Sequence, residues 1–227
     1  MTPSRGRAAG SRGAGSSASK VFLLSPANCG GIRAKLIMSP RAQFDLAQQI
    51  RREEGAPLGD IFSFVSGLYF RGKLAYARRF AAPPEPGDSE MSGGIFVITA
   101  NAGLRTPETP VTLDSFCAFA DAPIDLTNDV YRTSLERAAL SLHDCVGDDC
   151  QVVLLGSIAS GKYVELLQPI FGDNLLFPAE FVGRGDMSRG GLMLRCVAEG
   201  RELDYVPVAG AVRHGRRPPR LQPLQRR

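Results

Sequence analysis

Glycine-rich turns carry many of the residues in this 227-residue chain that could do chemistry. The most specific is GSIASGKY at residues 156–163, which fits the phosphate-loop pattern G-x-x-x-x-G-K but has tyrosine where serine or threonine would coordinate magnesium. A phenolic oxygen lies too far from the backbone to replace that hydroxyl, and no later apolar strand ends in the aspartate that would complete a magnesium site. We therefore expect a loop that contacts phosphate without hydrolysing a nucleotide, formed by Ser157, Ser160, Gly161 and Lys162.

Two arginines occur in a second glycine-rich segment, residues 183–191. Arg184 and Arg189 precede or begin a predicted helix, and backbone amides combined with cations suit a phosphate or a carboxylate. Asn28 and Asn101 occupy comparable turns, where they could bind the polar edges of a ligand. The alternative is that each segment is only a turn, because glycine, asparagine and serine favour turns for backbone reasons.

Other residues near these turns are candidates for catalysis or stacking. Glu180 is the carboxylate best placed for acid–base work or for holding ribose hydroxyls. Cys29 becomes a nucleophile if a helix N-terminus lowers its pKa, and is otherwise structural. Tyr69 and Phe70 stand beside two cations and could stack on a flat heterocycle, the alternative being core packing.

Several catalytic and metal-dependent classes are disfavoured. The chain has no G-x-S-x-G motif and only two histidines, His143 and His214, so a serine or cysteine triad has few available bases. His143, Cys145 and Cys150 occur within eight residues, but the pattern lacks a C-x-x-C pair and an evident fourth zinc ligand. We expect no metal and no bound cofactor.

The elements that position these residues follow from apolar runs and turn signals. Strands are predicted at 20–25, 94–99, 151–156, 175–177 and 202–206, several of them apolar throughout, as in strands buried on both faces. Helices are predicted at 40–55 after Ser39-Pro40, 73–80, 113–120, 132–142, 163–171 and 187–195, and a break is expected at Ser66-Gly67.

Alternation of strands and helices predicts an α/β fold: a three-layer sandwich with a mostly parallel central sheet and helices on both faces. The polar turns follow predicted strands, so they should meet at the carboxyl rim of the sheet, where open α/β sheets bind ligands.

Charge divides the chain into three parts. Ten of the 27 basic residues lie in residues 1–20 and 213–227, which contain no acid, so the remaining 17 face all 23 acids and residues 21–212 carry a formal charge of −6. We expect a disordered basic tail at 1–19, a single α/β domain at 20–212 and an Arg/Pro-rich tail at 213–227. The tails could contact nucleic acid weakly or only improve solubility.

Location follows from the segments that the chain lacks. It has no apolar core of a secretory signal and no apolar run of membrane-spanning length. Its five cysteines, an odd number, fit reduced thiols. The expected location is the cytoplasm, without a membrane partner.

Four segments together resemble a group of bacterial and phage α/β domains related in outline to uracil-DNA-glycosylase-like folds. The group has a first strand with a Ser/Cys-containing turn, an L-Y-x-S-x-L-F-like segment, an I-L-S-A-K-x-G-L strand with a Pro turn, and a Gly-rich loop with a helix. The similar stretches here are Leu24–Cys29, Gly67–Lys73, Val97–Leu104 with Pro107, and Gly183–Leu194. Asn101 stands where the pattern has lysine. The resemblance implies nucleobase or nucleic-acid handling and no particular reaction.

The leading hypothesis is a domain that binds a nucleotide, nucleoside or nucleobase at the carboxyl rim. A stronger version of this hypothesis is that the domain also processes that ligand. In this hypothesis the serines of the 156–163 turn, Lys162 and the two arginines hold the anionic part, while Asn101 and Glu180 read polar edges. The alternatives are a non-catalytic nucleic-acid-binding protein that uses the Arg-rich tails, and an interaction or scaffold protein.

Overall fold

The computed structural model describes residues 19–85, 92–219 and 221. Most of the predicted N-terminal tail and part of the predicted C-terminal tail therefore lie outside the described residues. Within the described part, the chain forms an α/β fold around a six-stranded, mostly parallel sheet. The predicted fold class is confirmed.

Four parallel strands form the centre of this sheet and two short antiparallel strands form its edges. The spatial order is β4-β3-β1-β6-β7-β8, in which β4 and β8 are the antiparallel edges. The strands of this sheet are β1 (Lys20–Leu24), β3 (Ile95–Ile98), β4 (Leu104–Arg105), β6 (Gln151–Leu155), β7 (Leu175–Pro178) and β8 (Tyr205–Pro207). A separate two-stranded sheet pairs β2 (Ala56–Pro57) with β5 (Pro110–Val111).

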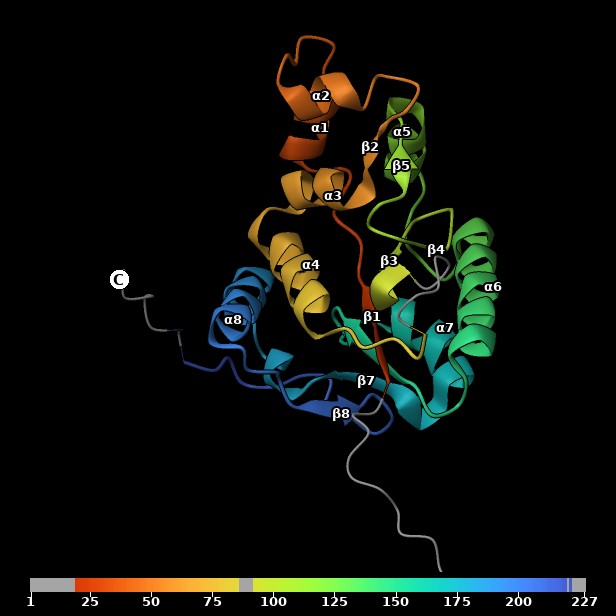
Figure 1. Cartoon of the computed structure of the whole chain (residues 1–227), viewed down its shortest axis with the longest axis vertical. Coiled ribbons are helices and arrows are strands. Elements are labelled where there is room, and N and C mark those ends of the chain that lie inside the picture. The colour runs from red at the N-terminus through yellow and green to blue at the C-terminus, as the bar shows by residue number, and fades with distance from the viewer. Residues whose placement is uncertain (1–18, 86–91, 220, 222–227) are drawn as a thin grey trace, which may run out of the picture.

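Helices cover both faces of the sheet, as Figure 1 shows. They are α1 (Ile32–Met38), α2 (Asp45–Gln49), α3 (Leu58–Ser66), α4 (Leu68–Phe80), α5 (Leu113–Asp121), α6 (Asp129–Val146), α7 (Gly161–Phe171) and α8 (Asp186–Glu199), with short 3-10 helices η1 (Ser92–Gly94), η2 (Gly172–Asn174) and η3 (Ala179–Phe181).

Alternate residues of the central strands enter two separate cores, which explains why these strands are apolar throughout. In β1, Phe22 and Leu24 pack with α3, α4 and α8, whereas Val21 and Leu23 pack with α6 and α7. All five residues of β1 are buried. The sheet is therefore the middle layer of a three-layer sandwich.

The strand order places a topological switch point between β1 and β6. The chain leaves β1 toward β3 on one side and later returns to β6 on the other, so the connections diverge beyond the carboxyl ends of β1 and β6. Diverging connections leave a crevice at this point in an open parallel sheet. Figure 1 shows α1, α2, α3 and α5 gathered beyond the carboxyl end of β1.

The predicted helix at 40–55 is wrong in its bounds. Helix α1 precedes it and ends at Met38, and α2 is only five residues long. The guanidinium of Arg51 donates to the carbonyls of Ser39 (2.5 Å) and Ala42 (3.1 Å). These bonds satisfy carbonyl groups of the turn, so the segment is stable without a continuous helix.

The predicted break at Ser66-Gly67 is confirmed. Gly67 has φ +59° and separates α3 from α4, a backbone conformation that residues with a Cβ rarely adopt. This turn redirects the chain so that α4 lies against the sheet and its first turn faces the crevice.

Helices α4 and α8 approach each other closely through glycines. A Cβ at Gly72 would lie 2.7 Å from the carbonyl oxygen of Gly190, and a Cβ at Gly190 would lie 2.7 Å from that of Leu68. This packing fixes how the residues on the two helices face each other across the crevice. Within the described residues, no helix has both the length and the apolarity needed to cross a membrane.

Candidate functional site

A cavity of about 710 Å³ opens at the switch point, beyond the carboxyl ends of β1 and β6. Three of the four predicted polar turns contribute to it: residues 25–30 after β1, Ala100 after β3, and Ser157, Ser160 and Lys162 after β6. The fourth contributes only through the start of α8. The turns therefore lie at one rim of the sheet, as expected, although several of the side chains predicted to face the cavity do not line it.

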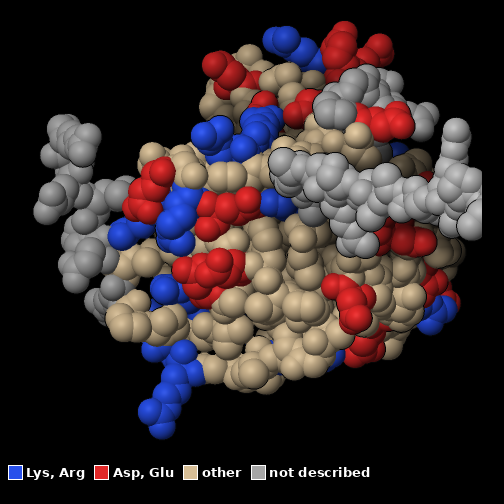
Figure 2. Space-filling model, turned by 60° about the horizontal axis from the view of Figure 1, so that its bottom comes forward, with Lys and Arg blue, Asp and Glu red and all other residues tan. Residues whose placement is uncertain are grey.

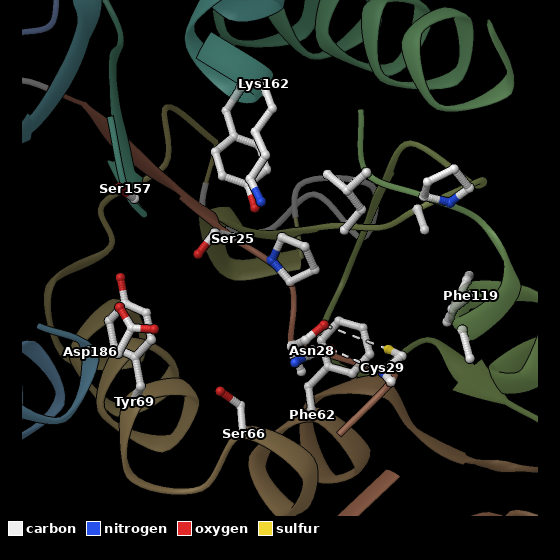
Figure 3. Close-up of a pocket in the computed structure, with 18 of the residues that line it drawn as sticks. Ser25, Asn28, Cys29, Phe62, Ser66, Tyr69, Phe119, Ser157, Lys162 and Asp186 are labelled. Atoms are coloured by element: carbon white, nitrogen blue, oxygen red, sulfur yellow. Dashed lines mark hydrogen bonds between the residues drawn. The ribbon is translucent and has the colours of Figure 1, made fainter. Parts of the chain in front are cut away.

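The cavity has an aromatic end and a cationic end. Figure 3 shows Lys162 at the top of the view, and Phe62 and Phe119 toward its bottom and right. Lys162 is the second residue of α7, and its backbone carbonyl accepts a hydrogen bond of 2.8 Å from the hydroxyl of Tyr131. This bond ties the start of α7 to α6 and fixes the position from which Lys162 enters the cavity.

Tyr69 presents a buried hydroxyl without a partner to the cavity. The residue is only 7% exposed and lines the cavity at the start of α4, yet its oxygen forms no hydrogen bond among the described residues. Burial raises the pKa of Tyr69, while the nearby Arg189 and Ser25 act to lower it. The hydroxyl therefore stays protonated and lies close to a cation and a second hydroxyl. Buried polar atoms nearly always have partners, so this one indicates a position where a ligand atom or water binds.

Arg189 and Asp186 close the cavity on the side of α8. The guanidinium of Arg189 donates to the carbonyl of Phe181 at 3.0 and 3.2 Å and lies 3.7 Å from the carboxylate of Asp186. Because these contacts hold the guanidinium in one orientation, its charge is a fixed feature of the cavity wall. Asp186 is the carboxylate of this wall, so the two side chains partly offset each other's charge.

Ser25 and Lys73 form a buried pair that the sequence analysis did not single out. The ammonium of Lys73 donates to Ser25 Oγ at 2.9 Å and also to the backbone carbonyl of Ser25. Lys73 is fully buried and lies over the rings of Tyr69 and Phe70, 4.5 and 4.9 Å from their centroids. Burial lowers the pKa of Lys73 to about 7, Asp186 opposing and Arg189 adding to this shift.

A sequence signal for Lys73 did exist. Tyr69, Phe70, Lys73, Tyr76 and Ala77 are spaced as one face of a helix, and all five are buried. A lysine in the middle of an apolar face is uncommon unless it is paired or functional. Ser25 gave no comparable signal, because a serine after a strand is ordinary.

Five predicted site residues do not line the cavity, Gly161 and Phe70 among them. Asn101 donates to the carbonyl of Ala118 at 3.1 Å, and Arg184 donates to the carbonyl of Glu180 at 2.9 Å and to Ser188. Glu180 has one carboxylate oxygen buried without a partner and the other 4.0 Å from Arg201. The structure therefore places these side chains outside the cavity, in the packing of the surrounding loops and α8.

Cys29 and Phe70 fit the structural alternatives to a nucleophile and a stacking ring. Burial raises the pKa of the Cys29 thiol to about 12, so the thiol is not activated, and it donates to the carbonyl of Ala27. The helix that follows begins only at Ile32. Phe70 is completely buried against Phe62, so no ligand ring can stack on it. Asn28 does line the cavity, and its side-chain oxygen accepts a bond from the Gly30 amide that shapes the turn.

Elsewhere in the described residues, no group of three His, Cys, Asp or Glu side chains is arranged to hold a metal ion. In the segment considered for zinc, Cys145 is exposed, Cys150 is buried, and His143 lies 3.2 Å from Asp148. The described cysteines are all free thiols.

Acidic and basic side chains are interspersed on the face of the molecule that Figure 2 draws. Over the described residues of that face, cations do not merge into one extended basic surface of the kind that would follow a nucleic-acid backbone.

Comparison of the chain with protein families, with curated proteins and with solved structures found no match.

Proposed function

We propose that the cavity binds a small anionic, nucleoside-like ligand, with a flat ring at its aromatic end and a phosphate or carboxylate near Lys162. The volume of about 710 Å³ falls in the range of about 300 to 1,000 Å³ that is usual for small-molecule sites. It exceeds what one or two ordered waters fill.

Chemical contrast along the cavity supports this class of ligand. Phe119, Pro123 and Ile124 line the apolar end, where Phe62 is only 1% exposed, while Lys162, Ser157 and Ser160 supply a cation and two hydroxyls beside the start of α7. A helix start attracts anions because its first backbone amides have no partner within the helix. The combination suits a molecule with one aromatic and one anionic part, and it agrees with the nucleobase handling that the sequence resemblance implies.

One observation carries the proposal: the buried Tyr69 hydroxyl, which lines the cavity close to Arg189 and Ser25 but forms no hydrogen bond of good geometry with a described residue. Leaving a buried polar group unsatisfied costs about 1 to 3 kcal/mol. A ligand that accepts or donates at this position would recover that free energy, so the group favours an occupied cavity.

The test is a thermal-shift panel of nucleotides, nucleosides and nucleobases against the wild-type protein, Lys162→Ala, Tyr69→Phe and Lys35→Ala. Lys35 is exposed on α1 and outside the cavity, so it is the matched lysine control. A ligand at 100 times its Kd stabilises the wild type by about 2.7 kcal/mol. We expect Lys162→Ala to weaken binding of an anionic member about 10- to 100-fold, because a charge-assisted hydrogen bond is lost. We expect Lys35→Ala to leave binding unchanged.

Two results contradict the proposal. One is a panel without any stabilising member. The other is a ligand whose affinity is the same in Lys162→Ala and Tyr69→Phe as in the wild type, because that ligand would bind outside the cavity.

A further inference from the structure

We propose that Ser25 is a nucleophile and Lys73 its general base, and that the cavity transfers the acyl group of an ester substrate. This inference rests on the proposed function for the position of the substrate, since the ester would be carried by the cavity ligand. It adds a reaction to a site that was so far described only as a binding site.

Position is the first argument. Ser25 is the first residue after β1, it lines the cavity at the switch point, and Figure 3 shows it between Lys162 and the pair Tyr69 and Asp186. The Ser25 backbone N–H donates a hydrogen bond of 3.2 Å to the Leu155 carbonyl, and the Ser25 carbonyl accepts one from Lys73. A nucleophile needs such a fixed position, because small displacements reduce the rate of attack strongly.

The partner of Ser25 is the second argument. Lys73 Nζ lies 2.9 Å from Ser25 Oγ, which is within the distance required for proton transfer. Lys73 forms no ion pair among the described residues: it contacts Ser25 and the rings of Tyr69 and Phe70, while Asp186 and Arg189 act on its charge from a greater distance. A buried lysine without a counter-ion easily loses its proton, and Ser–Lys pairs perform acyl transfer on unrelated folds.

Proton balance through the reaction is simple. The hydroxyl proton of Ser25 passes to the neutral amine of Lys73 as Oγ bonds to the ester carbonyl carbon. The Lys73 ammonium returns that proton to the alcohol oxygen when the bond between the carbonyl carbon and the leaving group breaks. Water then cleaves the acyl-Ser25 ester by the same transfers, so that one ester and one water give one acid and one alcohol.

The groups that bear on the proton of Lys73 come from two helices. Asp186 and Arg189 of α8 act on it in opposite directions, and Tyr69 of α4 lies beneath it. Burial is the largest cause of the lowered pKa, which is about 7. The fraction of neutral Lys73, and with it the nucleophilicity of Ser25, should therefore rise about tenfold per pH unit below 7 and level off above it.

The experiment is labelling of the full chain with an alkyl fluorophosphonate, followed by mass analysis of the peptides. Ser25 Oγ would bond to phosphorus, fluoride would leave, and the proton would pass through Lys73 to solvent. We expect one label, on Ser25, at a rate that follows the pH dependence given above. Ser25→Ala should abolish the label, and Lys73→Met should slow labelling at least about a hundredfold.

Ser134→Ala is the matched control, because Ser134 is also buried but lies outside the cavity. It should label at the wild-type rate. The pH profile of the wild type needs no variant, so it decides the matter even if Lys73→Met fails to fold. Absence of a label, a label on another residue, a flat profile between pH 5 and 9, or an unchanged rate in folded Lys73→Met would overturn the proposal.

Labelling separates this proposal from the proposed function. A labelled Ser25 together with an unresponsive ligand panel would keep the Ser25–Lys73 pair and reject the nucleoside-like ligand. A responsive panel without labelling of Ser25 would leave a binding site without this reaction.

Discussion

Lys73 places a titratable group in a part of the core where an apolar side chain would pack without an electrostatic cost. Its ammonium is fully buried, and its acceptors are the carbonyl and hydroxyl of Ser25. Desolvation disfavours the charged form, which is why the pKa falls from 10.5 to about 7. A residue that lowers stability but touches a cavity-lining hydroxyl is better explained by function than by packing.

The lowered pKa of Lys73 predicts an unusual pH dependence of stability. Between pH 7 and 9 the unfolded chain binds a proton at Lys73 that the folded chain does not, so the free energy of unfolding should rise with pH by about 2 kcal/mol from this residue. Lys73→Met removes the group. The difference in unfolding free energy between wild type and Lys73→Met should therefore shift by about 2 kcal/mol in favour of the wild type over this range.

Urea unfolding of both proteins at pH 7, 8 and 9 measures this shift. Using the difference cancels the contributions of other titrating groups, including Cys29, whose raised pKa acts in the opposite direction at high pH. A difference that stays constant with pH would mean that Lys73 remains charged in the folded protein.

The contact between α4 and α8 sets the geometry of the site at the level of elements. Helix α4 carries Tyr69 and Lys73, and α8 carries Asp186 and Arg189. The two helices meet at Gly72 and Gly190, where the backbone of one helix fills the space that a side chain would need on the other. The site residues therefore face each other because the helices lack side chains at this crossing.

This contact predicts a difference between two glycines of the same chain. Gly72→Ala places a Cβ 2.7 Å from the Gly190 carbonyl, so the helices must separate, and we expect a loss of about 1 to 3 kcal/mol in unfolding free energy. Gly191→Ala on α8 meets only a Leu221 methyl at 3.6 Å, an ordinary contact. It should be neutral or stabilise the helix by up to about 1 kcal/mol.

Thermal unfolding of the two variants tests this element-level account. Equal effects of the two substitutions would show that α4 and α8 do not pack as closely as described. A destabilised but folded Gly72→Ala should also lose ligand affinity, because its site residues no longer face each other at the same distance.

At the same level, the four central strands and helices α6 and α7 were predictable, whereas the short strands β2, β4 and β5, helix α3, the start of α4 and the first connection were not. The apolar strands and the break at Gly67 follow from local residues alone. Helix α1 was missed because only Ala34 and Ile37 of its seven residues are buried, which gives no recognisable apolar face. The conformation of residues 39–51 depends on Arg51, whose guanidinium hydrogen-bonds to carbonyls nine and twelve residues earlier in the chain. No local sequence pattern reveals such hydrogen bonds.

For the whole molecule, the topology predicts where the cavity lies, but only some of the residues that line it could be predicted from the sequence. Polar turns after parallel strands must meet at one rim, and Asn28, Tyr69, Ser157, Ser160, Lys162 and Arg189 do line the cavity. Glu180, Asn101 and Arg184 bond to neighbouring loops instead, because the directions of side chains within a turn depend on packing that the sequence does not display. Ser25 and Lys73 are 48 residues apart in sequence, and only the packing of α4 on β1 brings them together.

The central claim is that this cavity binds an anionic, nucleoside-like ligand, and a crystal structure with the most stabilising member of the nucleotide panel tests it most directly. The account predicts density beyond the carboxyl ends of β1 and β6, with the ring at the apolar end beside Phe119, the anionic group within hydrogen-bond distance of Lys162, and an atom hydrogen-bonded to the Tyr69 hydroxyl. Density at another place on the molecule, with this cavity filled only by water, would contradict it.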